Sequence, residues 1–134
     1  MTYPKILLVD DDLDDQKFFI DALQEISPNL YCSVANNGIE ALEHLALKPP
    51  PPSVIFLDLN MPLMNGLECL KNLKSNTLYN EIPVVILTTS NNSVYQLETA
   101  RLGAESYLTK ANSFEALKIN LKEVLEKRFG SIPS

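Results

Sequence analysis

Polar side chains follow four apolar stretches of the chain, and their types suit phosphoryl chemistry. They are three consecutive carboxylates at positions 10–12, a carboxylate at Asp58, a hydroxyl at Thr88 and an amine at Lys110. Several carboxylates brought to one place repel one another and resist ionisation. A hard divalent cation relieves this repulsion, and Mg²⁺ commonly bridges protein carboxylates to a phosphoryl group. The residues therefore predict a Mg²⁺ site beside a phosphoryl-binding site.

Asp58 stands where the reactive group would be. An ionised carboxylate attacks phosphorus without a general base, provided that its target is held in line and the transferred charge is neutralised. Lys110 would add compact positive charge for phosphoryl oxygens, and Thr88 a hydroxyl donor. Each residue alone also has an ordinary interpretation, as a helix cap, a turn hydroxyl or a solvated charge. The phosphoryl interpretation is favoured because all of them end apolar stretches.

The apolar stretches themselves are typical of strands buried on both faces. Val54–Leu57 has no polar alternation, as in parallel sheets covered by helices. Segments with helical spacing of apolar residues separate such runs. Strands are expected at 6–9, 31–35, 54–57, 83–87 and 106–109. Helices are expected at about 14–26, 39–46, 93–103 and 113–128, and a further helix begins at 65 and has a diffuse end between 75 and 80. The alternation predicts an α/β fold with a five-stranded parallel sheet and helices on both faces, and its site at the carboxyl ends of the strands.

Two helix starts carry specific expectations. Asn65 is predicted to cap the third helix. Ser93 is predicted to cap the fourth, with Val94, Leu97 and Ala100 facing the core.

Several residues receive structural interpretations. Cys32 and Cys69 lie in separate apolar segments and are expected to be small buried hydrophobes. His44 is expected to be a solvated surface residue. The four prolines at 49–52 favour a polyproline conformation, either as a docking motif or as a stiff loop, and the loop is favoured.

Size and composition point to one acidic domain. The 134 residues fit a single domain at 1–134, with a core at about 4–128 and a frayed tail at 129–134. The net charge of -6 argues against a nucleic-acid surface. No apolar run approaches the ~20 residues of a membrane helix, and the first residues lack a signal-peptide pattern. We therefore expect a cytoplasmic protein.

Together these residues resemble a response-regulator receiver domain over essentially the whole chain. The matching motifs are residues 7–11 (LLVDD), 57–62 (LDLNMP), 65–66 (NG), 87–90 (LTTS), 103–104 (GA) and 107–110 (YLTK). The resemblance implies a three-layer, doubly wound, flavodoxin-like sheet with strand order 2-1-3-4-5. It also implies a phosphoacceptor in a two-component phosphorelay rather than a turnover enzyme.

The resemblance implies a role for each acidic residue. Asp58 would accept a phosphoryl group from the phosphohistidine of a sensor histidine kinase. Asp11 and Asp58 would bind Mg²⁺ directly, together with the main-chain carbonyl of Asn60, and Asp10 would act through water.

It further implies a switch. Lys110 would hold the phosphoryl oxygens, Thr88 would move toward the phosphoryl group, and Tyr107 would turn inward with it. This motion would alter the surface of the fourth helix, fifth strand and fifth helix by biasing an existing two-state equilibrium.

Two positions depart from the family pattern. Ala111 follows Lys110 where the family usually has proline with a cis bond, and a non-proline cis bond costs ~3–4 kcal/mol. We therefore predict either a trans bond with a shifted Lys110 or a strained cis bond held by the site. Thr89 stands where the family commonly has the smaller Ala or Gly, and its larger side chain would slightly narrow the access of a phosphoryl group to the site.

The expected partners follow from the resemblance. They are a sensor histidine kinase or phosphotransfer protein and a downstream protein that the sequence does not name, with a homodimer through the last helices as an option. No nucleic acid or membrane is expected to bind directly. The chain resembles stand-alone receivers, including regulators that pair with bacterial phytochromes.

Two other functions compete with this one. Asp10 and Asp12 after a first strand, with Thr88 and a lysine, also resemble haloacid dehalogenase-like phosphatases, with Asp10 as nucleophile and Asp12 as general acid. That alternative leaves residues 58–62 unexplained and has neither an acidic pair after Lys110 nor a cap domain. The other is a pseudo-receiver, a binding module that is not phosphorylated, although all the acid, threonine and lysine positions are filled.

Overall fold

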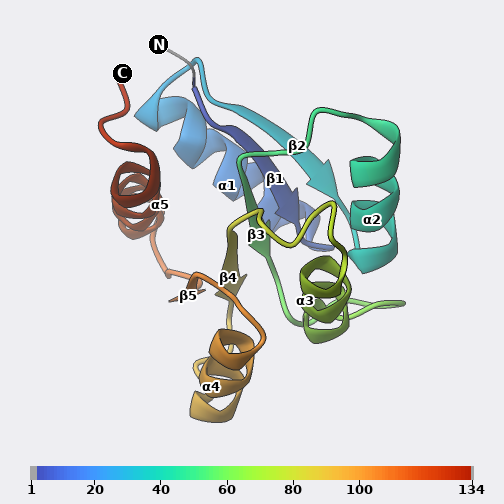
Figure 1. The fold of residues 1–134 in the computed structure, drawn as a ribbon. Coiled ribbons are helices and arrows are strands. Elements are labelled where there is room, and N and C mark those ends of the chain that lie inside the picture. The colour runs from blue at the N-terminus through green and yellow to red at the C-terminus, as the bar shows by residue number, and fades with distance from the viewer. Residues whose placement is uncertain (1–2, 134) are drawn as a thin grey trace.

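The computed structural model describes residues 3–133 as a parallel sheet flanked by helices (Figure 1). The strands are β1 (Lys5–Val9), β2 (Tyr31–Ala35), β3 (Val54–Leu57), β4 (Val84–Thr88) and β5 (Ser106–Thr109). The helices are α1 (Leu13–Ile26), α2 (Gly38–Leu47), α3 (Gly66–Ser75), α4 (Ser93–Arg101) and α5 (Phe114–Phe129). The strand order is β2-β1-β3-β4-β5, so the predicted α/β class, doubly wound sheet and strand order are confirmed.

Helices cover both faces of the sheet, which explains why its central strands are continuously apolar. Leu8 of β1 packs with residues of α1 and α5 in one core cluster. Its neighbour Leu7 points to the opposite face and packs with residues of α2 and α3. All side chains at 6–9 and 54–57 are at most 1 % exposed. The polar residues that end these strands are thus fixed to a rigid layer.

Side-chain caps fix where the helices begin. Asn65 caps α3 as predicted, in a capping box with Glu68. The cap of α4 is Asn92, whose side chain accepts a hydrogen bond from the Val94 N–H at 2.8 Å. The prediction of Ser93 as that cap is therefore wrong by one residue.

The predicted inward face of α4 is also wrong. Val94 and Leu97 are 65 % and 68 % exposed, and Ala100 is exposed as well. Thr99 is instead fully buried and Tyr95 packs partly against the core. Residues 95, 99 and 102 also follow helical spacing, and Thr99 can be buried because its hydroxyl donates to the Tyr95 carbonyl at 2.9 Å. The helix therefore turns its more apolar side toward solvent.

The end of the chain differs from the expected frayed tail. Ile132 is 7 % exposed and joins the core cluster beneath α1 and α5. Its N–H donates to the Glu126 carboxylate at 3.4 Å, and the Tyr3 hydroxyl donates to the Pro133 carbonyl at 3.5 Å. An apolar side chain close to the last helix is enough to bring the tail back onto the core.

The remaining structural interpretations hold in part. Cys69 is buried and Cys32 is partly buried, but His44 is partly buried rather than fully solvated. Residues 49–52 form a loop held by the Lys5 ammonium, which donates to the Pro50 carbonyl at 2.7 Å. Among the described residues, the helices are too short or too polar to cross a bilayer.

Candidate functional site

Two buried carboxylates lie at the carboxyl ends of neighbouring central strands. Asp10 follows β1 and Asp58 follows β3, and they are only 1 % and 6 % exposed. Both backbones continue the sheet, because the Asp10 N–H donates to the Ala35 carbonyl and the Asp58 N–H to the Val9 carbonyl, each at 3.0 Å. The sheet therefore fixes the spacing between these carboxylates.

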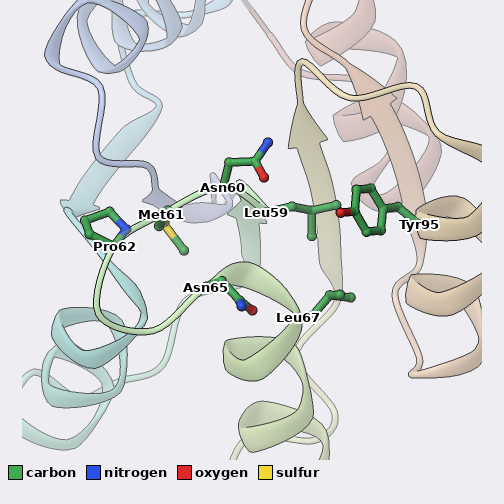
Figure 2. A pocket seen from close by; sticks show the side chains of 7 residues that line it. All are labelled: Leu59, Asn60, Met61, Pro62, Asn65, Leu67 and Tyr95. Carbon is green, nitrogen blue, oxygen red and sulfur yellow. The ribbon is translucent and has the colours of Figure 1, made fainter.

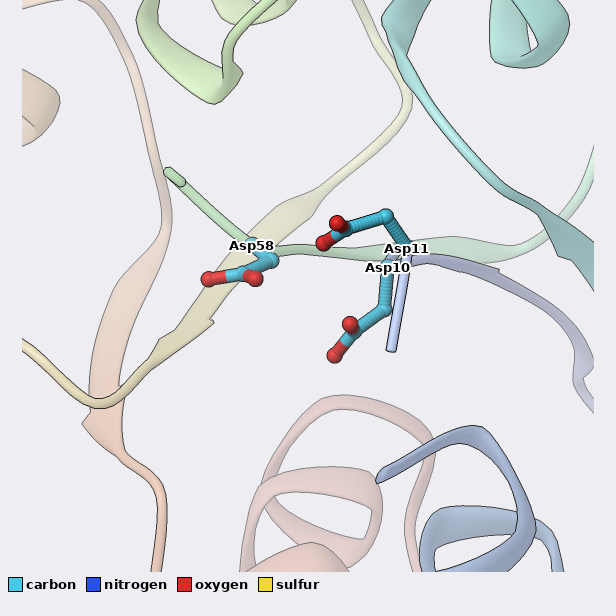
Figure 3. Close-up of side chains that lie close together, drawn as sticks. All are labelled: Asp10, Asp11 and Asp58. Carbon is cyan, nitrogen blue, oxygen red and sulfur yellow. The ribbon is translucent and has the colours of Figure 1, made fainter. Parts of the chain in front are cut away.

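Asp11 completes an acidic cluster with Asp10 and Asp58. Figure 3 shows the three side chains close together at this edge. Each offers a carboxylate oxygen, and these oxygens all lie within 4.8 Å of one another. In an octahedral Mg²⁺ site with bonds of about 2.1 Å, neighbouring ligand oxygens lie about 3 Å apart and opposite ones about 4.2 Å. The donor type and spacing thus fit a small hard cation.

Backbone donors orient the two buried carboxylates. The Asp12 N–H donates to Asp10 Oδ1 at 2.9 Å, and the Leu59 N–H donates to Asp58 Oδ1 at 2.8 Å. Each carboxylate keeps its Oδ2 atom for other partners. Burial raises the pKa of Asp10 above its ordinary value, although Lys110 and the Asp12 N–H act in the opposite direction.

Lys110 brings the positive charge to this cluster. Its ammonium lies 2.8 Å from Asp10 Oδ2, 2.8 Å from Asp15 Oδ2 and 3.5 Å from Asp58 Oδ2. Burial alone would lower the pKa of Lys110, but hydrogen bonds to Asp10 and Asp15 and the charge of Asp58 outweigh it and raise the pKa. The group stays charged and contacts three carboxylates, while Asp11 adds a fourth carboxylate to the cluster with Asp10 and Asp58.

The peptide bond after Lys110 excludes one of the two predicted arrangements. Within residues 3–133 the cis peptide bond is Pro49–Pro50, so the bond from Lys110 to Ala111 is trans and the strained cis alternative is wrong. The Lys110 N–H donates to the Thr88 carbonyl at 2.6 Å, which anchors the residue to β4. The ammonium lies closer to Asp10 and Asp15 than to Asp58.

Thr88 and Tyr107 lie on β4 and β5, which pair with each other in the sheet. Thr88 is fully buried at the end of β4, and its Oγ1 accepts from the Ser90 N–H at 3.5 Å. The Tyr107 hydroxyl donates to the Ser90 carbonyl at 2.6 Å and so joins β5 to the loop before α4. One short segment, residues 88–90, thus links both predicted switch residues.

An open groove borders the site on the side of α3 and α4. It has a volume of about 380 Å³, and Tyr95 faces Leu59 across it (Figure 2). Asn60 is exposed along this groove, two residues after Asp58. Gly66 packs directly against the backbone of residues 58 and 59, because a β-carbon there would lie 2.6 Å from the Leu59 Cα and closer still to the Asp58 carbonyl oxygen.

The sequence analysis missed Asp15 as a member of the site. Its pattern matched an ordinary acid in the first turn of a helix, where a negative charge favours the helix dipole. The sequence did carry one signal for this role. Asp15 lies five residues after Asp10, in the first turn of the helix that follows β1, and this turn lies close to the end of the strand.

Fold and site together define a class of protein: a doubly wound α/β domain with an acidic pocket that could hold a cation and one lysine at the carboxyl edge of its sheet. The response regulator receiver domain family matches residues 6–122. The chain therefore belongs to this family.

Individual relatives agree with this assignment. CheY1, a chemotaxis protein of Helicobacter pylori, is 31 % identical over 123 residues, covering 90 % of this chain and 96 % of that protein. The response regulator Rcp1 of Synechocystis is 32 % identical over 117 residues, covering 84 % and 80 %. Solved structures of the phosphorylated cyanobacterial phytochrome response regulator RcpA and of Mn²⁺-bound Rcp1 match with TM-scores of 0.88 and 0.83, each at 29 % identity, and cover at least 98 % of both chains.

The protein is thus a receiver-domain response regulator of two-component signalling. Receiver domains act as phosphoacceptor switches and bind Mg²⁺ at an acidic pocket. The cluster of Asp10, Asp11 and Asp58 is consistent with such a pocket. Neither the phosphatase nor the pseudo-receiver alternative is favoured by these relationships.

Proposed function

We propose that Asp58 accepts a phosphoryl group from a phosphohistidine of a sensor histidine kinase or phosphotransfer protein. A carboxylate oxygen of Asp58 forms a bond to phosphorus while the phosphorus–nitrogen bond breaks. The electron pair of that bond stays on the imidazole nitrogen, which then takes a proton from solvent. The observation that carries the proposal is a buried Asp58 with the Lys110 ammonium 3.5 Å from its Oδ2 and with two further carboxylates beside it.

Mg²⁺ is the proposed cofactor. Asp11, Asp58 and the main-chain carbonyl of Asn60 would hold it, with Asp10 acting through water. The bound cation supplies positive charge against the transferred phosphoryl group. The excess of carboxylates over ammonium groups in the pocket supports this assignment.

Thr88, Tyr107 and Lys110 are the proposed machinery of the response. The Thr88 hydroxyl would donate to the phosphoryl group, and Lys110 would hold its oxygens. Tyr107 is already tied to the residues after Thr88 through its bond to the Ser90 carbonyl. Movement of Thr88 would therefore reach the surface formed by α4, β5 and α5.

The remaining assignments concern the whole protein. The chain would act as a single cytoplasmic domain, phosphorylated and dephosphorylated in stoichiometric steps rather than turning over a substrate. Its input would come from a histidine kinase, and the match to phytochrome response regulators favours a phytochrome-type sensor. Its output would be binding of a downstream protein, with homodimerisation through the last helices as a further option.

Intact mass spectrometry after treatment with acetyl phosphate or phosphoramidate tests the proposal. The wild type should gain one phosphoryl mass only with Mg²⁺ present, and Asp58→Asn should gain none. Asp10→Asn serves as the comparison, since the phosphatase alternative uses Asp10 as its nucleophile. Labelling of Asp58→Asn but not of Asp10→Asn would overturn the proposal.

A further inference from the structure

The Lys110 ammonium has a partner that the proposed phosphoryl chemistry does not use. Asp15, in the first turn of α1, accepts a hydrogen bond from it at 2.8 Å, as short as its contact with Asp10. Asp15 is 40 % exposed in its side chain, whereas Asp10 is 2 % exposed. The lysine therefore bridges a buried acid and an acid on the rim.

The position of the ammonium is biased toward α1. Lys110 and Asp15 both line a small cavity of about 30 Å³ between α1 and α5, together with Phe18 and Ala111, and Asp58 lies outside that lining. The contact with Asp58 is the longest of the three, at 3.5 Å. Because the ammonium has three hydrogens, each strong contact on the α1 side leaves less of its capacity for a group on Asp58.

We propose that Asp15 is a positioning residue that holds Lys110 on the α1 side of the site and competes with a phosphoryl group on Asp58 for the ammonium. The proposal rests on Asp58 being the phosphoacceptor. Two effects of Asp15 would both weaken binding of a phosphoryl group at Asp58. Its carboxylate occupies a donor hydrogen of Lys110, and its negative charge repels an incoming anion. Asp10 would keep the ammonium in the site when Asp15 is removed, because its 2.8 Å contact is buried.

Asp15→Asn is the most direct test of this competition. The amide keeps the size and one acceptor oxygen of the carboxylate but removes its charge. We expect the Mg²⁺-dependent beryllofluoride complex, which resembles a phosphoryl group on Asp58, to bind about two- to fivefold more tightly, as one partly exposed charge contact would give. The dissociation constant is measured by titrating beryllium at fixed fluoride and following backbone amide NMR shifts.

Asp14→Asn is the matched control. Asp14 is exposed, carries the same charge and lies in the same first turn of α1, while the acid partners of Lys110 are Asp10, Asp15 and Asp58. It should change the dissociation constant by less than about 1.5-fold, since a solvated charge is screened. Asp15→Glu, which keeps the charge, should restore affinity to near the wild-type value.

Asp15→Ala separates competition from simple orientation. Competition predicts tighter binding in both Asp15→Ala and Asp15→Asn, whereas a residue that only orients Lys110 or supports the helix would give weaker binding in Asp15→Ala. Equal affinities for Asp15→Asn and Asp14→Asn, or a loss of affinity in Asp15→Ala, would overturn the inference alone. A wild type that neither responds to beryllofluoride nor becomes labelled on Asp58 would overturn the proposed function, and the inference with it.

Discussion

Gly66 is the position where the site should tolerate least change, and the substitution Gly66→Ala tests this. Gly66 begins α3 against the chain that follows β3, and its N–H donates to the Leu59 carbonyl at 2.9 Å. An added β-carbon would lie 2.6 Å from the Leu59 Cα, whereas carbon atoms pack best at about 3.5–4.0 Å. The nearest atoms belong to the backbone, so α3 and the end of β3 must separate by about 1 Å.

Three contributions determine how far Gly66→Ala should lower the free energy of unfolding. Overpacking of this kind costs about 1–3 kcal/mol, and weakening of the bond from Gly66 to the Leu59 carbonyl adds about 1 kcal/mol. Alanine offsets about 1 kcal/mol through its helix propensity. We expect the free energy of unfolding to fall by about 2 kcal/mol, which corresponds to a drop in Tm of about 5–10 °C for a domain of this size.

Gly130→Ala provides the matched control. Gly130 has a φ of 83°, and a β-carbon there would meet no atom within 4 Å among the described residues. It should therefore show only the backbone cost of an alanine at φ 83° and ψ -173°, a region that is essentially restricted to glycine, which is about 1–3 kcal/mol. Urea denaturation of both variants gives the comparison. A Gly66→Ala protein as stable as the wild type would refute the packing argument.

Three further outcomes follow from other parts of the structure. Leu63 is 79 % exposed with a φ of 66°, so Leu63→Asn should raise the free energy of unfolding by about 0.5–1 kcal/mol in urea titrations. Burial raises the pKa of Cys32 and Cys69 to about 12, so a thiol reagent should modify both only after unfolding. Because the pKa of Asp10 is raised above 3.8, protons should compete with Mg²⁺ at a higher pH than at an ordinary aspartate. Calorimetric Mg²⁺ affinity should thus fall more on acidification in the wild type than in Asp10→Asn.

The strands and their polar ends were predictable because burial on both faces leaves a direct mark in the sequence. A continuous apolar run as short as Val54–Leu57 is typical of a strand covered by helices on both sides, and the residue after it must lie at the sheet edge. The contact between Lys110 and Asp15 was not predictable in the same way, since it joins residues 95 positions apart whose side chains need no particular local pattern. The burial of Ile132 was missed for a similar reason: it depends on a tertiary contact and not on periodicity.

The wrong prediction for α4 has a physical meaning for the proposed switch. In most helices the apolar pattern of the sequence and the packing of the core agree, so that the apolar residues face inward. A helix that breaks this agreement is expected mainly at a functional site. Here α4 buries Thr99 and exposes Val94 and Leu97, so little apolar area binds the helix to the sheet. The loop before it is attached to β5 through the bond from the Tyr107 hydroxyl to the Ser90 carbonyl. A weakly buried helix tied to the residues after Thr88 can change position for a small free-energy cost, because few buried contacts must be broken. One new hydrogen bond from Thr88 to a charged phosphoryl group, which contributes about 1.5–3 kcal/mol, would then favour such a change of position.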